Sequence, residues 1–170
     1  MSLEPFFEVP LVVQAHVVGA LLALVLGPLA MLRRRRDFWH KALGYGFVVA
    51  MALTACSAAF IYSLRLIGPF SPIHLLIPLT LYSLWMGVRL ARRGEIKAHR
   101  AQMVSLYWQA IGVAGLFTFL PTRLMNELVF GGGSWLGFAV VAVVGGAFMV
   151  WLTRRVTGQA AGPAGAVVHE

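Results

Sequence analysis

Acidic residues are scarce in this sequence. Its 170 residues include six Asp and Glu against fourteen Lys and Arg, which gives a formal net charge of +8. Charged residues make up only 12% of the chain, hydrophobic residues make up 59%, and the mean hydropathy is +0.80. An ordinary soluble domain carries about 25% charged residues. The shortage of charge therefore excludes that class and indicates a chain that is surrounded mostly by lipid.

Cysteine and the common catalytic motifs are also lacking. The single cysteine, Cys56, lies within an apolar run and cannot form a disulfide within one chain. The sequence contains no HExxH or CxxC, and no carboxylate falls inside a long apolar stretch. A metalloprotease site or a relay of proton-carrying carboxylates therefore lacks its parts. These absences leave open whether the protein is an enzyme.

The excess of basic residues has two interpretations, namely nucleic-acid binding or the loops of a membrane protein. Their location decides between the two. The run "RRRR" at residues 33–36 directly follows a long apolar segment, and the other clusters also stand at the ends of such segments. We therefore expect the lipid bilayer, and no nucleic acid, as the partner of these residues.

Five apolar stretches are each long enough to cross a bilayer as a helix. They cover residues 11–32, 41–64, 73–90, 103–120 and 136–153. The sequence thus predicts an all-α integral membrane bundle with five transmembrane helices. We expect one bundle domain over residues 1–155 and a disordered cytoplasmic tail, rich in Gly and Ala, over residues 156–170.

Small residues recur at four-residue spacing in the first apolar stretch, at Ala15, Gly19, Ala23 and Gly27. Such a stripe lets another helix or a flat ligand approach closely. Of these two interpretations, helix packing is the more common one.

Basic residues are divided unequally between the two sides of the predicted bundle. One side holds Arg33 to Arg36, Lys41, Arg92, Arg93, Lys97, Arg100, Arg154 and Arg155. The other side has Arg65 and Arg123 as its only bases, together with three glutamates. Lys and Arg collect on the cytoplasmic side of membrane proteins. This rule places the N-terminus outside and the C-terminus in the cytoplasm.

Four histidines, His16, His40, His74 and His99, each lie near the start of one of the first four predicted helices. Because consecutive helices alternate in direction, His16 and His74 fall in the outer half, whereas His40 and His99 fall at the inner edge. Each pair joins helix i to helix i+2. Two neutral imidazoles from facing helices can ligate the iron of haem b.

The two histidine pairs cannot share one metal centre. About 16 residues separate His16 from the inner end of its helix, or roughly 24 Å at about 1.5 Å per residue. The pattern therefore predicts one or two haem b sites, at different depths, in a carrier that takes electrons from a cytoplasmic donor or quinol to an outer acceptor. Haem propionates need basic partners, for which Arg65 and Arg123 are available outside, and Arg100, Lys41 and the run Arg33 to Arg36 inside.

A cofactor-free interpretation competes with this one. His40 and His99 stand in basic connections, where a histidine can simply be an interface residue. His16 lies inside an apolar helix, where an ionisable residue indicates function. A zinc or copper site at His16 and His74 would need further ligands. The alternative function is a non-enzymatic membrane subunit, or a small-molecule carrier, with no cofactor.

Three segments resemble a bacterial family of small predicted membrane proteins of unknown function. They read "AHVVGALLALVLGPLAMLRRRR", "FWHKALGYGFVVAM" and "EIKAHRAQMVSLYWQA", and the resemblance covers roughly residues 11–125. The matching features are His16, Gly27-Pro28, His40-Lys41 with Gly44, His99-Arg100 and Arg123. The resemblance implies an integral protein of the bacterial cytoplasmic (inner) membrane and no established activity.

A looser resemblance is to two-haem transmembrane cytochromes b of the ascorbate-ferrireductase type. Those proteins also pair histidines from helices i and i+2 at two depths. The present chain departs from them in having five predicted helices where six are usual. This resemblance implies haem b as the cofactor, and a quinone or another redox protein as the partner.

Overall fold

The computed structural model describes residues 4–33, 35–61, 72–121, 123–131 and 133–158, and these residues form helices without any strand. The all-α prediction is confirmed for this part of the chain. The elements are α1 (Glu4–Glu8), α2 (Leu11–Leu32), α3 (Phe38–Ala58), the 3-10 turn η1 (Pro72–Leu75), α4 (Leu76–Arg92), α5 (Ile96–Tyr107), the π-helical η2 (Trp108–Val113), α6 (Ala114–Thr118), α7 (Leu124–Phe130) and α8 (Trp135–Gly158).

Polar residues account for most of the differences between the predicted and the observed helix boundaries. α3 begins at Phe38 rather than at residue 41, because Asp37 caps it by accepting a hydrogen bond from the His40 backbone N–H at 3.1 Å. α5 begins at Ile96 rather than at residue 103, directly after a turn in which Gly94 has a φ of 76°. α8 continues to Gly158, past residue 153 where the apolar run ends and into the expected tail.

The expected connection over residues 121–134 contains a helix that apolar windows do not reveal. α7 occupies Leu124–Phe130 and ends at Gly131, whose φ of 76° is the left-handed conformation that terminates many helices. The second half of this connection is held by Asn126, which is fully buried and forms three hydrogen bonds with backbone groups.

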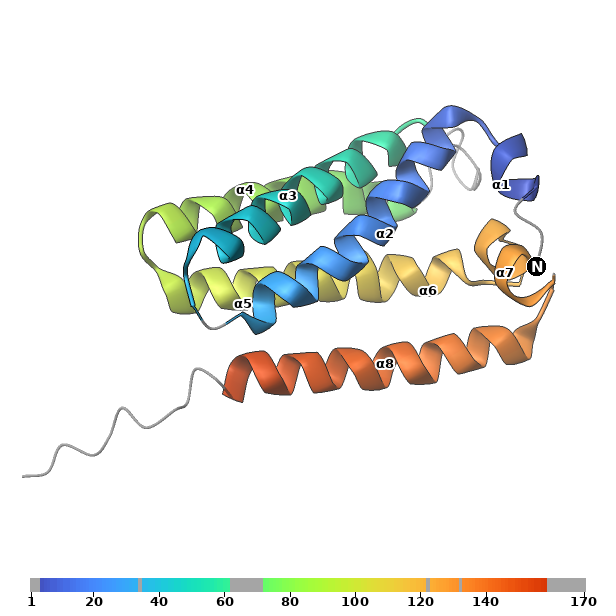
Figure 1. Ribbon diagram of the computed structural model, residues 1–170. Coiled ribbons are helices and arrows are strands. Elements are labelled where there is room, and N and C mark those ends of the chain that lie inside the picture. Colours follow the sequence, from blue (N-terminus) through green and yellow to red (C-terminus); the bar gives the residue numbers. More distant parts are fainter. Residues whose placement is uncertain (1–3, 34, 62–71, 122, 132, 159–170) are drawn as a thin grey trace, which may run out of the picture.

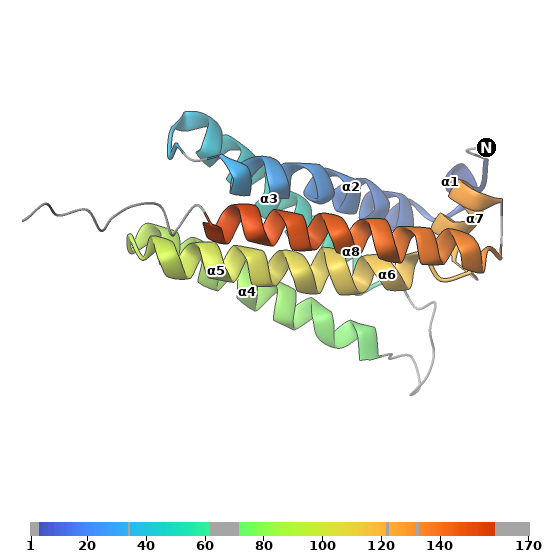
Figure 2. The ribbon, with the colours of Figure 1, turned by 90° about the horizontal axis from the view of Figure 1, so that it is seen from below.

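Four helical units form a ring in which each packs on two others. α2 packs on α3, α3 on α4, α4 on α5, and α5 packs back onto α2. α2 therefore lies diagonally opposite α4, and α3 diagonally opposite α5. α8 lies outside this ring, along α5 and α6, and also contacts α2 (Figures 1 and 2).

The middle of the ring is filled by side chains. Phe47, Met51 and Leu106 are buried there, and the hydroxyl of the buried Tyr107 donates a hydrogen bond to the carbonyl of Leu24 on α2 at 2.8 Å. A Cβ atom on Gly27 would lie 2.6 Å from the Tyr107 ring. The small-residue stripe of α2 therefore serves helix packing at Gly27.

Basic and acidic residues gather at opposite ends of the helical bundle. The α2–α3 connection, the α4–α5 connection and the C-terminal end of α8 lie together at one end of the bundle, whereas α1 and α7 lie at the opposite end (Figure 1). The first group carries most of the arginines, and the second carries Glu8 and Glu127. Below we call them the basic end and the acidic end.

Three helices among the described residues are long and apolar enough to cross a membrane, namely α2, α3 and α8. Only 28% of the most apolar stretch of α2 or α3 is buried within the chain, and 17% of that of α8. The remaining apolar surface is suited to lipid. Five spans and their orientation remain predictions.

We expect Gly19→Leu to separate α2 from α3. A Cβ atom at Gly19 would lie 2.7 Å from Thr54 Oγ1 and 3.2 Å from the Ala50 carbonyl oxygen, and that backbone oxygen cannot move aside easily. Overpacking of this kind lowers the free energy of unfolding by about 1–3 kcal/mol. Thermal unfolding in detergent measures it. The control is Gly115→Leu, because a Cβ atom there meets nothing within 4 Å. Equal losses for both variants would contradict the predicted contact.

Candidate functional site

His40 and His99 lie on the diagonal helices α3 and α5, near the basic end. His40 sits in the first turn of α3, which Asp37 caps, and His99 in the first turn of α5 after the Gly94 bend. The Arg33 side chain forms a two-point ion pair with Asp37, and its Nε donates to Asp37 Oδ1 at 2.8 Å. This hydrogen bond to Arg33, with the bond from the His40 backbone, holds the pKa of the Asp37 carboxyl well below its usual range.

Both imidazoles are fixed through the same ring nitrogen. His40 Nδ1 lies 3.1 Å from the carbonyl oxygen of Ala30 on α2, and His99 Nδ1 lies 2.8 Å from that of Gly87 on α4. A carbonyl only accepts, so Nδ1 carries the proton in both rings. In the neutral ring Nε2 then keeps a lone pair. Metal-ligating histidines commonly have this arrangement, with one N–H held by a carbonyl and the other nitrogen free to bind.

Basic side chains lie around His99. His40, Arg36 and Arg100 are near enough to act electrostatically on its ring. His40 and His99 are therefore within electrostatic range of each other, as the predicted inner pair requires. Arg36 and Arg100 also favour an anion beside the two rings.

His16 is fixed to α3 in the same manner. Its Nδ1 lies 2.9 Å from the carbonyl oxygen of Thr54 and 3.2 Å from Ser57 Oγ. Ser57 itself donates to the Leu53 and Thr54 carbonyls, so its hydroxyl proton is already engaged. The Nδ1–H tautomer again follows, and Nε2 is the nitrogen left for a ligand.

His74 lies in η1, immediately before α4, and is half-buried. η1 leads into the helix that stands diagonally opposite α2, so His16 and His74 belong to a diagonal pair of helical units. The expectation that these two rings share a haem stays a prediction.

Three of the arginines predicted as propionate partners have different surroundings. Arg100 donates through Nη1 to the carbonyl of Val156 on α8 at 3.3 Å, so it links α5 to the end of α8. Arg123 directly precedes α7 at the acidic end. Arg65 lies outside the described residues. Arg36 is near enough to act electrostatically on His99. The sequence alone does not show which of the four consecutive arginines lies near the inner histidines.

The number of metal-ligating side chains near one another is too small for a conventional metal centre in the described part of the chain. Within the part of the chain that the structure describes, no group of three or more His, Cys, Asp and Glu side chains could hold a metal ion. Structural and catalytic zinc sites use three or four protein ligands. Two histidines suffice only where a macrocycle supplies the remaining ligands, as in haem.

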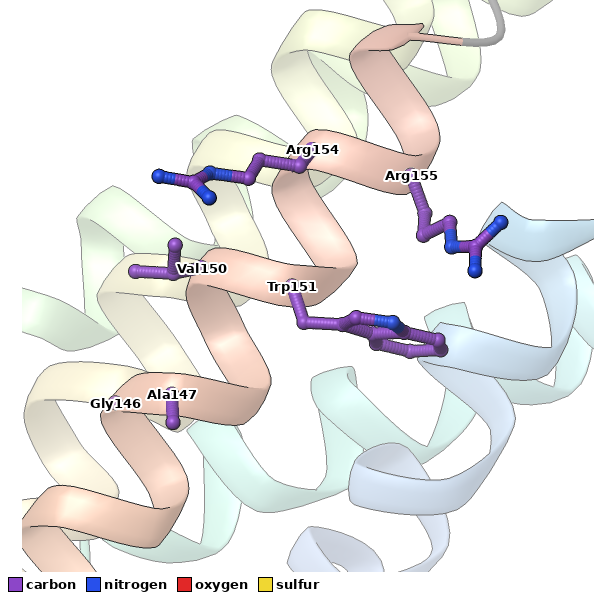
Figure 3. Close-up of a pocket in the computed structure, with 6 residues that line it drawn as sticks. All are labelled: Gly146, Ala147, Val150, Trp151, Arg154 and Arg155. Carbon is purple, nitrogen blue, oxygen red and sulfur yellow. The ribbon is translucent and has the colours of Figure 1, made fainter.

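A shallow groove lies on the outside of α8, away from the histidines. It is lined by Gly146, Ala147, Val150, Trp151, Arg154 and Arg155 (Figure 3). All six residues belong to one helix, and the two arginines stand at its basic end. The sequence does not reveal this groove, because it does not show which face of α8 is buried and which is exposed.

Comparison with protein families gives one match. The family described as "Predicted membrane protein (DUF2306)" matches residues 13–153. The chain belongs to this family. The resemblance found in the histidine-bearing segments is thereby confirmed. The DUF2306 match also includes α8, which lies beyond the range of that resemblance.

The remaining comparisons add no further relatives. No curated protein and no solved structure matches the chain significantly. Membership of the DUF2306 family makes this a predicted membrane protein in contact with the lipid bilayer. The resemblance to two-haem cytochromes b stays a prediction.

Proposed function

We propose that the chain crosses the bacterial inner membrane five times, with its N-terminus outside. α2, α3 and α8 have the length and composition for this on their own. η1 and α4 together cover residues 72–92, and α5, η2 and α6 cover 96–118. Each of these two units extends over about 30 Å, the thickness of a bilayer core. The gathering of arginines at one end supports a cytoplasmic location for that end.

Thiol labelling distinguishes five spans from three. In a Cys56→Ser background we expect an impermeant maleimide on intact cells to label Glu127→Cys, but neither Arg35→Cys nor Lys97→Cys; all three replaced side chains are exposed. If only α2, α3 and α8 crossed the membrane, the α4–α5 connection would lie outside, and Lys97→Cys would react. Inverted vesicles supply the control, since the pattern should reverse there. Labelling of Lys97→Cys from outside would contradict five spans.

We propose further that this bundle is a haem b electron carrier with bis-histidine sites. The observation that carries the proposal is the inner pair. His40 and His99 come from diagonal helices, lie within electrostatic range, and are each held through Nδ1–H so that Nε2 is the ligating nitrogen. His16 and His74 would form the outer site on the other diagonal. The donor set fits a haem.

Met103 beside the inner pair, and the side chains of Phe47, Met51 and Leu106 that fill the middle of the ring, would have to make room for a macrocycle. Met103 follows His99 by one helical turn, and its Cε occupies the space directly over Gly87, where a Cβ would lie only 1.8 Å away. Methionine is a flexible side chain that adapts to irregular spaces. Gly87, which has no side chain of its own, leaves that space open once Met103 turns aside.

The residues of the chain would act by holding and orienting the group. His40 and His99 would hold it through Nε2, and the carbonyls of Ala30 and Gly87 would keep both rings in the binding tautomer. Arg36 would stabilise anionic carboxylates on its rim. When bound, haem supplies one-electron transfer between a cytoplasmic donor or quinol and an outer acceptor.

The haem content of purified protein tests this function. After expression with haem supply and purification in detergent, we expect two haems per chain, or one if only the inner pair binds. A folded preparation that carries no haem above the level of a helical membrane protein without paired histidines would contradict the proposal.

A second candidate is a cofactor-free membrane subunit in which the histidines are structural. The specific observation in its favour is that three of them form hydrogen bonds with neighbouring helices. His16 bonds to α3, His40 to α2 and His99 to α4. On this account Gln replacements, which can donate the same bond, would leave stability and partner assembly intact.

A further inference from the structure

We propose that the groove on α8 binds a phospholipid with an anionic headgroup, in the leaflet at the basic end. This site is independent of the haem and rests only on the proposed membrane embedding of α8. The groove runs between two rows of side chains at four-residue spacing. One row is Gly146, Val150 and Arg154, and the other is Ala147, Trp151 and Arg155.

The position of the groove makes it accessible to lipid. The face of α8 that carries Met149, Leu152 and Val156 is buried against the bundle, and Thr153 accepts a hydrogen bond from Trp108 Nε1 at 2.8 Å. The two rows of the groove lie on the opposite face. Figure 3 shows Arg154 and Arg155 directed to either side of the helix above Val150 and Trp151.

The chemistry of the groove matches the two parts of a phospholipid. Val150 and the Trp151 ring form walls for an acyl chain, and Gly146 and Ala147 leave the floor low. The guanidinium of Arg155 lies over the Trp151 ring, 5.9 Å from its centroid, which keeps it beside the groove.

Charge determines which phospholipid fits. Two guanidinium groups at the basic end can bracket a phosphodiester, for which their planar donors are well shaped. The one ion pair among the described side chains joins Arg33 to Asp37, so neither Arg154 nor Arg155 is neutralised by a carboxylate there. A zwitterionic headgroup would bring its own cation to this pair of arginines, whereas phosphatidylglycerol brings a net negative charge.

Quenching of tryptophan fluorescence by brominated acyl chains tests the site. The full chain, free of haem, is reconstituted in phosphatidylcholine vesicles that contain either brominated phosphatidylglycerol or brominated phosphatidylcholine. The signal of Trp151 is obtained by subtracting that of Trp151→Phe. We expect the anionic lipid to reach half-maximal quenching at a mole fraction lower by about fivefold to 25-fold, since each of the two arginines can contribute about fivefold at an anionic membrane surface. Equal quenching by both lipids would overturn the proposal. It would do so even where crosslinking showed that a second copy of the chain covers α8.

Matched variants separate the groove from the general charge of the basic end. Arg154→Gln/Arg155→Gln should abolish the preference, whereas Arg92→Gln/Arg93→Gln, also exposed at that end, should keep it. Gly146→Leu should block the groove, and Gly145→Leu should not; a Cβ at either glycine meets nothing within 4 Å, so both variants should fold. Equal effects within either pair of variants would overturn the assignment. Haem content should be unchanged throughout, so failure of this site and failure of the haem proposal are distinguishable.

Discussion

His99→Ala is expected to remove the inner haem and to lower the haem content by about half if both sites are filled, because a single imidazole from His40 holds the iron far less firmly than two. The variant also removes the bond to the Gly87 carbonyl on α4, so its folding must be checked by thermal unfolding. The measurement is haem per chain after purification in detergent. Free imidazole added to the purified variant should restore binding, since it can occupy the vacated position.

Lys97→Ala is the matched control for His99→Ala. Lys97 lies in the same helical turn of α5 but is exposed, so its loss should leave the haem content unchanged. His40→Ala should reproduce the effect of His99→Ala, and combining the two should add nothing further at the inner site. A folded His99→Ala protein with undiminished haem would rule out His99 as a ligand.

Asn126→Ala is expected to have the largest effect on stability. The amide donates to the carbonyls of Phe119 and Ser134 at 2.9 and 3.0 Å, and accepts from the Ser134 backbone N–H at 3.0 Å. Because Asn126 is fully buried, truncation leaves those backbone groups without partners. Each such buried group costs about 1–3 kcal/mol, so the free energy of unfolding should fall by roughly 3 kcal/mol or more.

Denaturation in mixed detergent micelles measures the effect of Asn126→Ala. The neighbouring Glu127→Ala is the control, because Glu127 is exposed and an exposed substitution changes stability by about 0.5 kcal/mol or less. A loss no larger for Asn126→Ala than for Glu127→Ala would mean that water or lipid headgroups satisfy the Phe119 and Ser134 groups equally well.

Hydropathy was sufficient to locate the long helical units but not their polar ends. The predicted range of α2 agrees with the observed one, because both of its ends coincide with changes in composition, at Pro10 and at the arginine run. The first seven residues of α5 were missed, because Lys97, His99 and Arg100 depress hydropathy although they continue the helix. Here side chains that extend to the membrane interface override the apolar pattern.

α7 and η2 show what apolar windows cannot detect. The spacing of Leu124 and Leu128, followed by Gly131, was an available signal for a short helix with a glycine cap. The π-helical turn over Trp108–Val113 has no comparable signal in the sequence. Its first residue, Trp108, donates a hydrogen bond to Thr153 on α8, which is a contact that the local sequence does not reveal.

The placement of the histidines was predictable from the sequence only as far as the order of the helices allowed. Alternating direction placed His40 and His99 at one end, and the ring of four helical units puts α3 and α5 on a diagonal, as this pairing requires. The sequence did not indicate that Ala30 and Gly87 would fix the ring nitrogens, because backbone carbonyls carry no sequence signature. That fixed tautomer is what makes the inner pair the stronger of the two candidate sites.

The most direct test of the bis-histidine proposal is the reduced-minus-oxidised absorption spectrum of the purified full-length chain, expressed with haem supply. The account predicts the sharp α-band of low-spin haem b with two imidazole ligands, which His99→Ala diminishes and Lys97→Ala leaves unchanged. A folded, monodisperse preparation without that band, or with a band that survives the loss of both His40 and His99 at full intensity, would contradict it.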